Sequence, residues 1–289
     1  MAADDDKTAS DASLASTLRV ADGPVNLLGY DTSAKPLAPG GKSKTLAALA
    51  EDGAELADLQ ERLYANGAKG AQRRVLLVLQ GMDTSGKDGV VEHVVGMVDP
   101  AGVSIKAFKR PTPEEEAHHF LWRIRKALPG PGMIGVLNRS HYEDVVITTV
   151  HDWIDDDVWA ERVWEINAFE RELTDAGTII VKCFLHISYA EQRARLLARL
   201  DDETKIWKFD PADIDERAYW SDYQTRYAAA IAKTSTDAAP WYIVPSDAKW
   251  YRNWAIGRLL RDALRELDLH YPPADFDIEA CRARLQPPY

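Results

Sequence analysis

Near the end of its first third, the chain reads Val75-Leu-Leu-Val-Leu-Gln80-Gly81-Met82-Asp83-Thr84-Ser85-Gly86-Lys87-Asp88-Gly89. An apolar run followed by Gly-x-x-x-x-Gly-Lys is typical of a buried strand that leads into a phosphate-binding loop and then a helix. In such a loop, successive backbone N–H groups point at phosphate oxygens, and the lysine at the helix start supplies a positive charge. The sequence therefore predicts an α/β fold with a phosphate site after its first strand.

The loop has two unusual carboxylates. Asp88 stands where nucleotide hydrolases place a Ser or Thr that binds magnesium, and Asp83 lies inside the loop itself. Two acids beside a polyphosphate need cations between them, so we expect Mg²⁺, with Mn²⁺ as the alternative. Apolar residues at helical spacing predict a helix over 87–98 after the loop.

Length and composition limit the function. A chain of 289 residues with 46% apolar residues can form one large α/β domain with an insertion, which we favour over two small domains. The net charge of −11 argues against general nucleic-acid binding. The two cysteines have no metal spacing, and neither a membrane span nor a basic signal-peptide start is evident. We expect a soluble cytoplasmic protein without nucleic-acid or membrane partners.

Apolar segments alternate with helical patterns along the chain. We expect strands at 75–79, 103–108, 133–137, 178–185 and 241–244, and helices at 45–65, from 112 onward, at 156–173 and at 249–267. This alternation predicts a parallel sheet with helices on both faces. We divide the chain into a flexible N-terminal segment (1–44), a domain with the phosphate-binding loop (45–270) and a C-terminal tail (271–289).

A long, charged and helical stretch covers residues 188–233 and includes Arg193 and Arg199. In P-loop kinases such a segment is a lid that closes over the phosphates and brings arginines to the transferring group. A solvent-facing helical hairpin is the alternative reading.

A second polar segment, Asn138-Arg139-Ser140-His141-Tyr142-Glu143-Asp144, follows the third predicted strand. The carboxyl ends of parallel strands hold ligand-binding groups. Asn138 stands where a Walker B aspartate is expected, so we assign the metal-supporting carboxylate to Asp144, opposite Asp83, and a phosphate contact to Arg139. Alternatively, Asn138 caps a turn and Asp144 belongs to a solvated helix start. We expect His141 to form a structural hydrogen bond rather than bind a metal.

Four segments together resemble the family-2 polyphosphate kinases, and the Asn-Arg-Ser-His-Tyr-Glu-Asp form is most similar to their class III branch. These segments are 78–89, 108–112 (Phe-Lys-Arg-Pro-Thr), 138–145 and 205–209 (Lys-Ile-Trp-Lys-Phe). The resemblance spans roughly residues 40–270. It implies a P-loop kinase-like fold with a helical lid.

The resemblance also implies a reaction and roles for individual residues. The reaction is Mg²⁺-dependent phosphoryl transfer between inorganic polyphosphate and nucleotides, which converts AMP to ADP, ADP to ATP, or both. The resemblance also implies a homo-oligomer. The implied catalytic residues are Asp83, Lys87, Arg139 and Asp144, with Asp83 and Asp144 holding the metal. The expected phosphate- or nucleotide-binding residues are Gly81, Met82, Thr84, Ser85, Gly86, Asp88, Gly89, Lys109, Arg110, Asn138, His141, Tyr142, Glu143, Arg193, Arg199 and Lys208.

Two alternatives remain open at this stage. One is an ATP-dependent nucleoside monophosphate kinase of thymidylate-kinase type, and the other is a P-loop sensor that binds nucleotide or polyphosphate without turnover. The absence of a clear base histidine fits kinase chemistry on a phosphate acceptor, because a phosphate is already anionic and needs no strong general base.

Overall fold

The computed structural model describes residues 13–286 and has a single five-stranded sheet among them. The strand order is β2-β3-β1-β4-β5, and all neighbouring strands are parallel. The strands are β1 (Arg74–Gln80), β2 (Val103–Ala107), β3 (Ile134–Asn138), β4 (Thr178–His186) and β5 (Trp241–Pro245). The five predicted strands are thus confirmed, with small shifts at their ends. The central position of β1 puts the loop that follows it at the middle of the carboxyl edge of the sheet.

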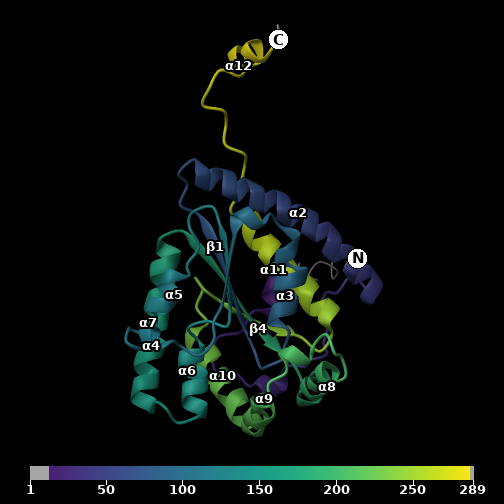
Figure 1. The fold of residues 1–289 in the computed structure, drawn as a ribbon, viewed down its shortest axis with the longest axis vertical. Coiled ribbons are helices and arrows are strands. Elements are labelled where there is room, and N and C mark those ends of the chain that lie inside the picture. The colour runs from purple at the N-terminus through teal and green to yellow at the C-terminus, as the bar shows by residue number, and fades with distance from the viewer. Residues whose placement is uncertain (1–12, 287–289) are drawn as a thin grey trace, which may run out of the picture.

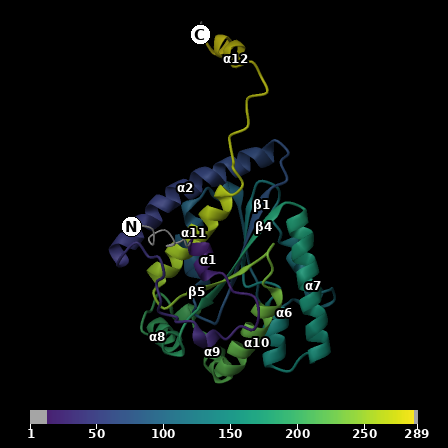
Figure 2. The same ribbon diagram turned by 180° about the vertical axis from the view of Figure 1, so that it is seen from behind.

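Helices cover both faces of the sheet (Figures 1 and 2). One face carries α1 (Leu14–Leu18), α2 (Lys42–Ala68), α3 (Lys87–His93) and α11 (Lys249–Arg265). The other carries α5 (Trp122–Lys126), α6 (Glu143–Val150), α7 (Asp156–Asp175) and α10 (Trp220–Thr234). Beyond these lie α4 (Pro113–Glu116), α8 (Tyr189–Leu200), α9 (Ala212–Glu216) and α12 (Ile278–Leu285).

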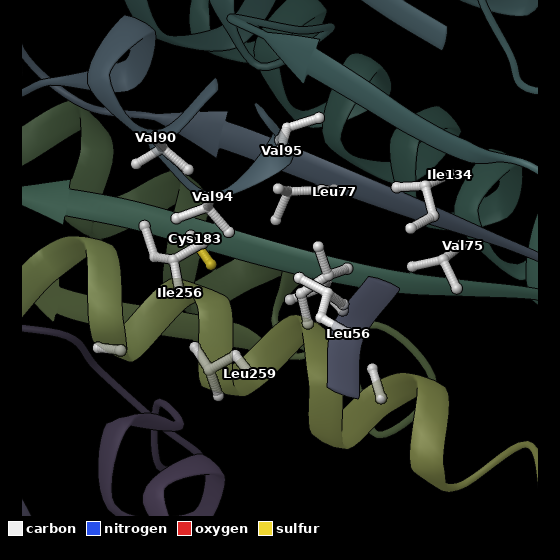
Figure 3. Packing of buried hydrophobic residues seen from close by; sticks show 14 of the residues in the cluster. Leu56, Val75, Leu77, Val90, Val94, Val95, Ile134, Cys183, Ile256 and Leu259 are labelled. Carbon is white, nitrogen blue, oxygen red and sulfur yellow. The ribbon is translucent and has the colours of Figure 1, made fainter. Parts of the chain in front are cut away.

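The buried strands pack alternate side chains into two separate cores. Leu77 of β1 belongs to the first core, together with Leu56 of α2 and Ile256 of α11 (Figure 3). Its neighbour Val78 belongs to the second core, on the other face of the sheet. Because successive strand residues point to opposite faces, a strand that is buried on both sides must be apolar throughout. This requirement explains the continuous apolar run of β1.

Two predicted helices are shorter than expected. The helix after the loop ends at His93, and a 3-10 turn, Val95–Met97, follows. Val94, Val95 and Gly96 have low helix propensity, which explains the early end. The helix after Thr112 has the predicted capping box, but it stops at Glu116 and resumes as α5.

The N-terminal segment differs from the loosely ordered one that its composition suggests. Leu14 and Leu18 of α1 are buried in the first core, and Arg19 forms a β-bridge with Tyr242 of β5. Leu27 is 2% exposed. A few well-spaced leucines are therefore enough to fix this segment on the sheet. The expectation for residues 1–12 lies outside the described part of the chain.

The chain ends in an arm that carries α12 away from the body (Figures 1 and 2). No residue of α12 is buried. Within residues 13–286, no helix has the length and apolarity needed to cross a membrane.

Candidate active site

The loop after β1 has the backbone that its glycines permit. Gly81 and Gly86 have φ values of 148° and 106°, which L side chains rarely adopt. A Cβ atom at Gly81 would lie 2.6 Å from the carbonyl oxygen of Leu185. Gly81 therefore lets the chain leave the sheet close to β4, and Gly86 turns it into α3.

Lys87 begins α3 and folds back over the loop. Its Nζ donates to the carbonyl oxygens of Gly81, at 2.7 Å, and Met82, at 3.3 Å. No carboxylate among the described residues lies within 4.0 Å of this ammonium. Burial, followed by the charge of Arg139, lowers the pKa of Lys87 to about 8. Lys87 is thus a buried cation whose hydrogen bonds go to backbone oxygens, while Asp83, Glu143 and Asp88 act on it from beyond contact distance, which leaves it able to bind a phosphate.

The loop also carries two buried hydroxyl groups. Oγ1 of Thr84 and Oγ of Ser85 have no hydrogen-bond partner among residues 13–286. Buried polar atoms in proteins are usually satisfied, so these two are candidates to bind a ligand oxygen. Thr84 has a φ of 62°, an uncommon value for a residue with a side chain.

The second polar segment lies beside the loop because β3 pairs with β1. Leu79 is opposite Asn138 in the sheet, and the Arg139 N–H donates to the Leu79 carbonyl oxygen at 3.1 Å. The Arg139 guanidinium then reaches Asp83, with Nη2 2.5 Å from Oδ1. Glu143 lies 3.8 Å from Nη1, and its charge is the main cause of the raised pKa of Arg139. The phosphate-binding loop and the second polar segment are therefore in contact.

Asn138 has a partner that explains its amide. Its Nδ2 donates to Oδ1 of Asp88 at 2.6 Å. Asp88 replaces the usual Ser or Thr of the loop, and Asn138 replaces the expected Walker B aspartate. These two unusual residues are thus hydrogen-bonded to each other. An aspartate at position 138 would instead bring two carboxylates together, which is unfavourable without a cation between them.

Asp144, predicted to support a metal opposite Asp83, pairs with an arginine. Its carboxylate is 14% exposed, and Oδ2 lies 3.2 Å from Nη2 of Arg123. Arg123 also donates to the Lys109 carbonyl oxygen at 3.0 Å. Burial raises the pKa of Asp144, although Arg123 opposes the shift. Asp144 thus supports the segment around Lys109 through Oδ2, and its metal role stays a prediction. No cluster of three or more His, Cys, Asp or Glu side chains in residues 13–286 is suited to hold a metal.

His141 and Tyr142 also differ from the expected phosphate contacts. Both are 1% exposed, and both contact Oε1 of Glu170, at 3.2 Å and 2.7 Å. Lys182 binds the other oxygen of Glu170 at 2.5 Å and also contacts the Tyr142 hydroxyl at 3.0 Å. We call Glu170, Lys182, His141 and Tyr142 the buried polar cluster. The cluster fixes the segment that carries Arg139, and only the structural hydrogen bond expected for His141 agrees with it.

The lid region consists of α8, α9 and α10 and contacts the loop through α8. Nε2 of Gln192 donates to the Asp83 carbonyl oxygen at 3.2 Å. Nη1 of Arg195 donates to the carbonyl oxygens of Thr84, at 2.8 Å, and Ser85, at 3.0 Å. Among the basic residues predicted to bind phosphate, Lys109, Arg110, Arg193 and Lys208 are exposed. Arg199 instead holds the lid together through the Lys208 carbonyl oxygen and Asp213.

The sequence analysis assigned no role to Arg195, Arg123, Glu170, Lys182 or Arg252. Arg252 had a detectable signal, because it lies on the otherwise apolar side of α11 that includes Ile256 and Leu259. A lone cation on an apolar helix face is a candidate for a buried role. Lys182 had a similar signal, because it interrupts the apolar run of β4. Arg123, Arg195 and Glu170 lack such a signal.

Comparison with known proteins decides the family. Residues 41–271 match the family described as Polyphosphate kinase 2. The chain belongs to this family. The predicted resemblance is therefore confirmed, and the match covers everything from α2 to the end of α11.

Two curated relatives illustrate what the chain is similar to. The AMP/ADP-polyphosphate phosphotransferase of Meiothermus ruber is 45% identical over 251 residues, which cover 87% of this chain and 92% of the relative. The ADP-polyphosphate phosphotransferase of Rhodopseudomonas palustris is 41% identical, with coverage of 75% and 78%.

A solved structure from the same family has the same fold. The crystal structure of polyphosphate kinase 2 from Arthrobacter aurescens TC1 is 51% identical and superposes with a TM-score of 0.92. The superposition covers 94% of this chain and 96% of that one. The predicted P-loop kinase-like fold is therefore confirmed.

Proposed function

We propose that this chain transfers phosphoryl groups between inorganic polyphosphate and adenine nucleotides. The transfer converts AMP to ADP and ADP to ATP. The observation that carries the proposal is Lys87, a buried ammonium at the end of a phosphate-type loop that hydrogen-bonds to two backbone oxygens. Membership of the polyphosphate kinase 2 family, and a relative named as an AMP/ADP-polyphosphate phosphotransferase, support polyphosphate rather than ATP as the phosphoryl donor. The static sensor and the ATP-dependent kinase are correspondingly less favoured.

The proposed mechanism depends on alignment and charge. Phosphoryl transfer passes through a loose transition state, so the protein must place donor and acceptor in line and balance charge on the equatorial oxygens. Lys87 and the loop N–H groups bind the phosphoryl group in transfer, and Arg139 holds the acceptor phosphate. Asp83 orients Arg139 through their 2.5 Å contact. The lid excludes water, so that transfer to nucleotide outcompetes hydrolysis.

We propose Mg²⁺ as the cofactor, with Asp83 as its protein ligand. The contact with Arg139 uses Oδ1, and the side chain is 29% exposed, so the carboxylate can also reach a cation. Mg²⁺ at nucleotide sites is commonly held by one or two carboxylates plus substrate phosphates, and it neutralises charge on those phosphates.

A donor exchange assay tests the proposed function. Purified protein is incubated with Mg²⁺ and AMP, ADP, GMP or GDP, with either long-chain polyphosphate or ATP as donor, and products are separated by chromatography. We expect ADP and ATP to form from AMP and ADP with polyphosphate. Product with ATP but none with polyphosphate would refute the proposal. The guanine nucleotides measure base selectivity.

Two further expectations stay predictions. The first is a cytoplasmic location, where the nucleotide substrates are abundant. The second is a homo-oligomer, which light scattering coupled to size-exclusion chromatography measures directly.

A further inference from the structure

An arginine of α11 lies directly behind the phosphate-binding loop. Arg252 is 2% exposed and donates from Nη1 to the Ser85 carbonyl oxygen at 3.1 Å. Its Nε and Nη2 bind Oδ1 of Asn253 at 3.1 Å and 2.8 Å. A Cβ atom at Gly86 would overlap Nη1, and one at Gly89 would lie 2.7 Å from Nη2. The guanidinium therefore packs against the backbone that begins α3.

Arg252 has no carboxylate partner. Its hydrogen bonds go to a carbonyl and an amide oxygen, and no Asp or Glu of residues 13–286 lies within 4.0 Å of its guanidinium nitrogens. A second arginine, Arg195, donates to the same Ser85 carbonyl oxygen and is itself paired with Glu191 at 2.7 Å. Burial and the charge of Arg195 lower the pKa of Arg252 to about 9. A buried, unpaired charge of this kind disfavours folding unless something compensates it.

The other buried cation of the loop, Lys87, is in a different situation. Its ammonium lies at the Gly81 and Met82 carbonyl oxygens, whereas Arg252 lies at the Ser85 carbonyl oxygen. The charges of Asp83, Glu143 and Asp88 oppose the lowering of the Lys87 pKa, but no carboxylate does so for Arg252. Arg252 is therefore a buried cation beside the loop that lacks a carboxylate partner among residues 13–286.

We propose that Arg252 is a positioning residue for phosphate binding: the phosphate bound in the loop is the counter-ion that Arg252 lacks. Arg252 acts through the Ser85 and Gly86 backbone without touching the substrate. Charges interact strongly across a buried, low-dielectric region, so this arginine raises the affinity of the loop for polyphosphate by about tenfold or more. The inference rests on the proposed function, since it assumes that the loop binds phosphate.

Binding of tripolyphosphate, without nucleotide, tests this role independently of turnover. Wild type, Arg252→Gln and Arg252→Lys are compared by titration calorimetry and by thermal unfolding with and without tripolyphosphate. We expect the glutamine variant to bind about tenfold more weakly or worse. Its unligated Tm should equal or exceed that of wild type, because a costly charge is gone, and its gain in Tm on binding should shrink. The lysine variant keeps the charge, so its affinity should stay within about threefold of wild type.

Arg261 provides a matched control on the same helix. It is also buried, at 4% exposed, but it contacts the carboxylates of Asp52 and Asp262. Arg261→Gln should lower the unligated Tm and leave the tripolyphosphate affinity unchanged.

Three outcomes would overturn the inference. The first is a glutamine variant with a lower unligated Tm and wild-type affinity, which would make Arg252 a structural residue only. The second is a lysine variant that binds as weakly as the glutamine variant, because charge would then not be the cause. The third is wild-type protein that fails to bind tripolyphosphate, which would overturn the proposed function as well.

Discussion

Nη2 of Arg139 lies 2.5 Å from Oδ1 of Asp83, which joins the ends of two neighbouring strands across the site. Each side chain is about one-third exposed, so both remain open to a ligand. The pair has two functions in the proposed mechanism, because Asp83 both orients the guanidinium and offers an oxygen to Mg²⁺.

We predict that Asp83→Asn and Arg139→Met each lower kcat by about a hundredfold or more, because each removes a charge that acts on the phosphates. The double variant should lose much less than the product of the two effects, since the residues act as a unit. Steady-state kinetics and circular dichroism measure turnover and folding. Asp275→Asn, at a surface ion pair with Lys69, is the control and should leave kcat unchanged. Fully multiplicative losses would show that the two residues act independently.

Lys87→Ala should lower turnover by several orders of magnitude while the fold stays intact. The reason is that the ammonium is the only side chain of the loop that carries positive charge to the transferring phosphoryl group. Near-normal rates in this variant would refute the placement of the site.

The lowered pKa of Lys87 predicts how stability depends on pH. Below its folded pKa of about 8, the ammonium is charged in the folded and unfolded protein, so its burial cost is fully present. As the pH rises from about 8 towards 10.5, the folded lysine loses its proton while the unfolded one keeps it. The free energy of unfolding should therefore rise by up to about 3 kcal/mol relative to Lys87→Met. Denaturant unfolding at several pH values measures the difference, and parallel curves for the two proteins would contradict it.

Substitutions of Asp144 and Asp83 should have different effects on the Mg²⁺ concentration that the enzyme needs. Asp144 binds Arg123 and Asp83 remains accessible. We predict that Asp83→Asn raises the Mg²⁺ concentration needed for half-maximal activity, whereas Asp144→Asn leaves it unchanged and raises the KM for polyphosphate through the Lys109 segment. Chelation of Mg²⁺ should stop turnover in both variants and in wild type. A shifted Mg²⁺ requirement in Asp144→Asn would restore the metal role that the sequence suggests.

Removing one charge from the buried polar cluster should destabilise the fold more than replacing both charges with apolar side chains. Lys182→Met removes the cation from Glu170 and should lower the free energy of unfolding by about 3 kcal/mol, because it leaves a buried carboxylate less well balanced. The double variant Lys182→Met, Glu170→Met should recover part of this loss. Urea unfolding measures both. A single variant that costs less than about 1 kcal/mol would mean that the carboxylate is already balanced by His141 and Tyr142.

Local patterns in the sequence predicted the sheet and the loop. The strand residues around Leu77 are apolar because both faces are buried, and Gly81 and Gly86 are required by backbone geometry. Such features depend on nearest neighbours in the chain, so they can be recognised without a structure. That the two polar segments lie together also followed, because parallel strands bring their carboxyl ends together, but the ion pair of Arg139 with Asp83 was not predicted.

Partners from distant parts of the chain could not be predicted in this way. Asp144 was assigned to a metal because Asn138 replaces the expected aspartate, and no pattern indicated that Arg123 would lie beside Asp144. The same holds for Glu170, which binds Lys182 of the next strand and the two residues before Glu143. Ion pairs between separate elements depend on packing, and the sequence alone does not specify which charges meet.

The backbone at Thr84 and Arg139 sets a limit on engineering this chain for heat resistance. Both residues have a φ of 62°, a conformation that costs an ordinary side chain about 1 kcal/mol or more. A search for thermostable variants would therefore find glycine attractive at both positions. At position 139 that substitution would remove the guanidinium bound to Asp83, so the gain in stability would come with a loss of activity. Selection for stability and selection for turnover thus pull in opposite directions at this corner of the sheet.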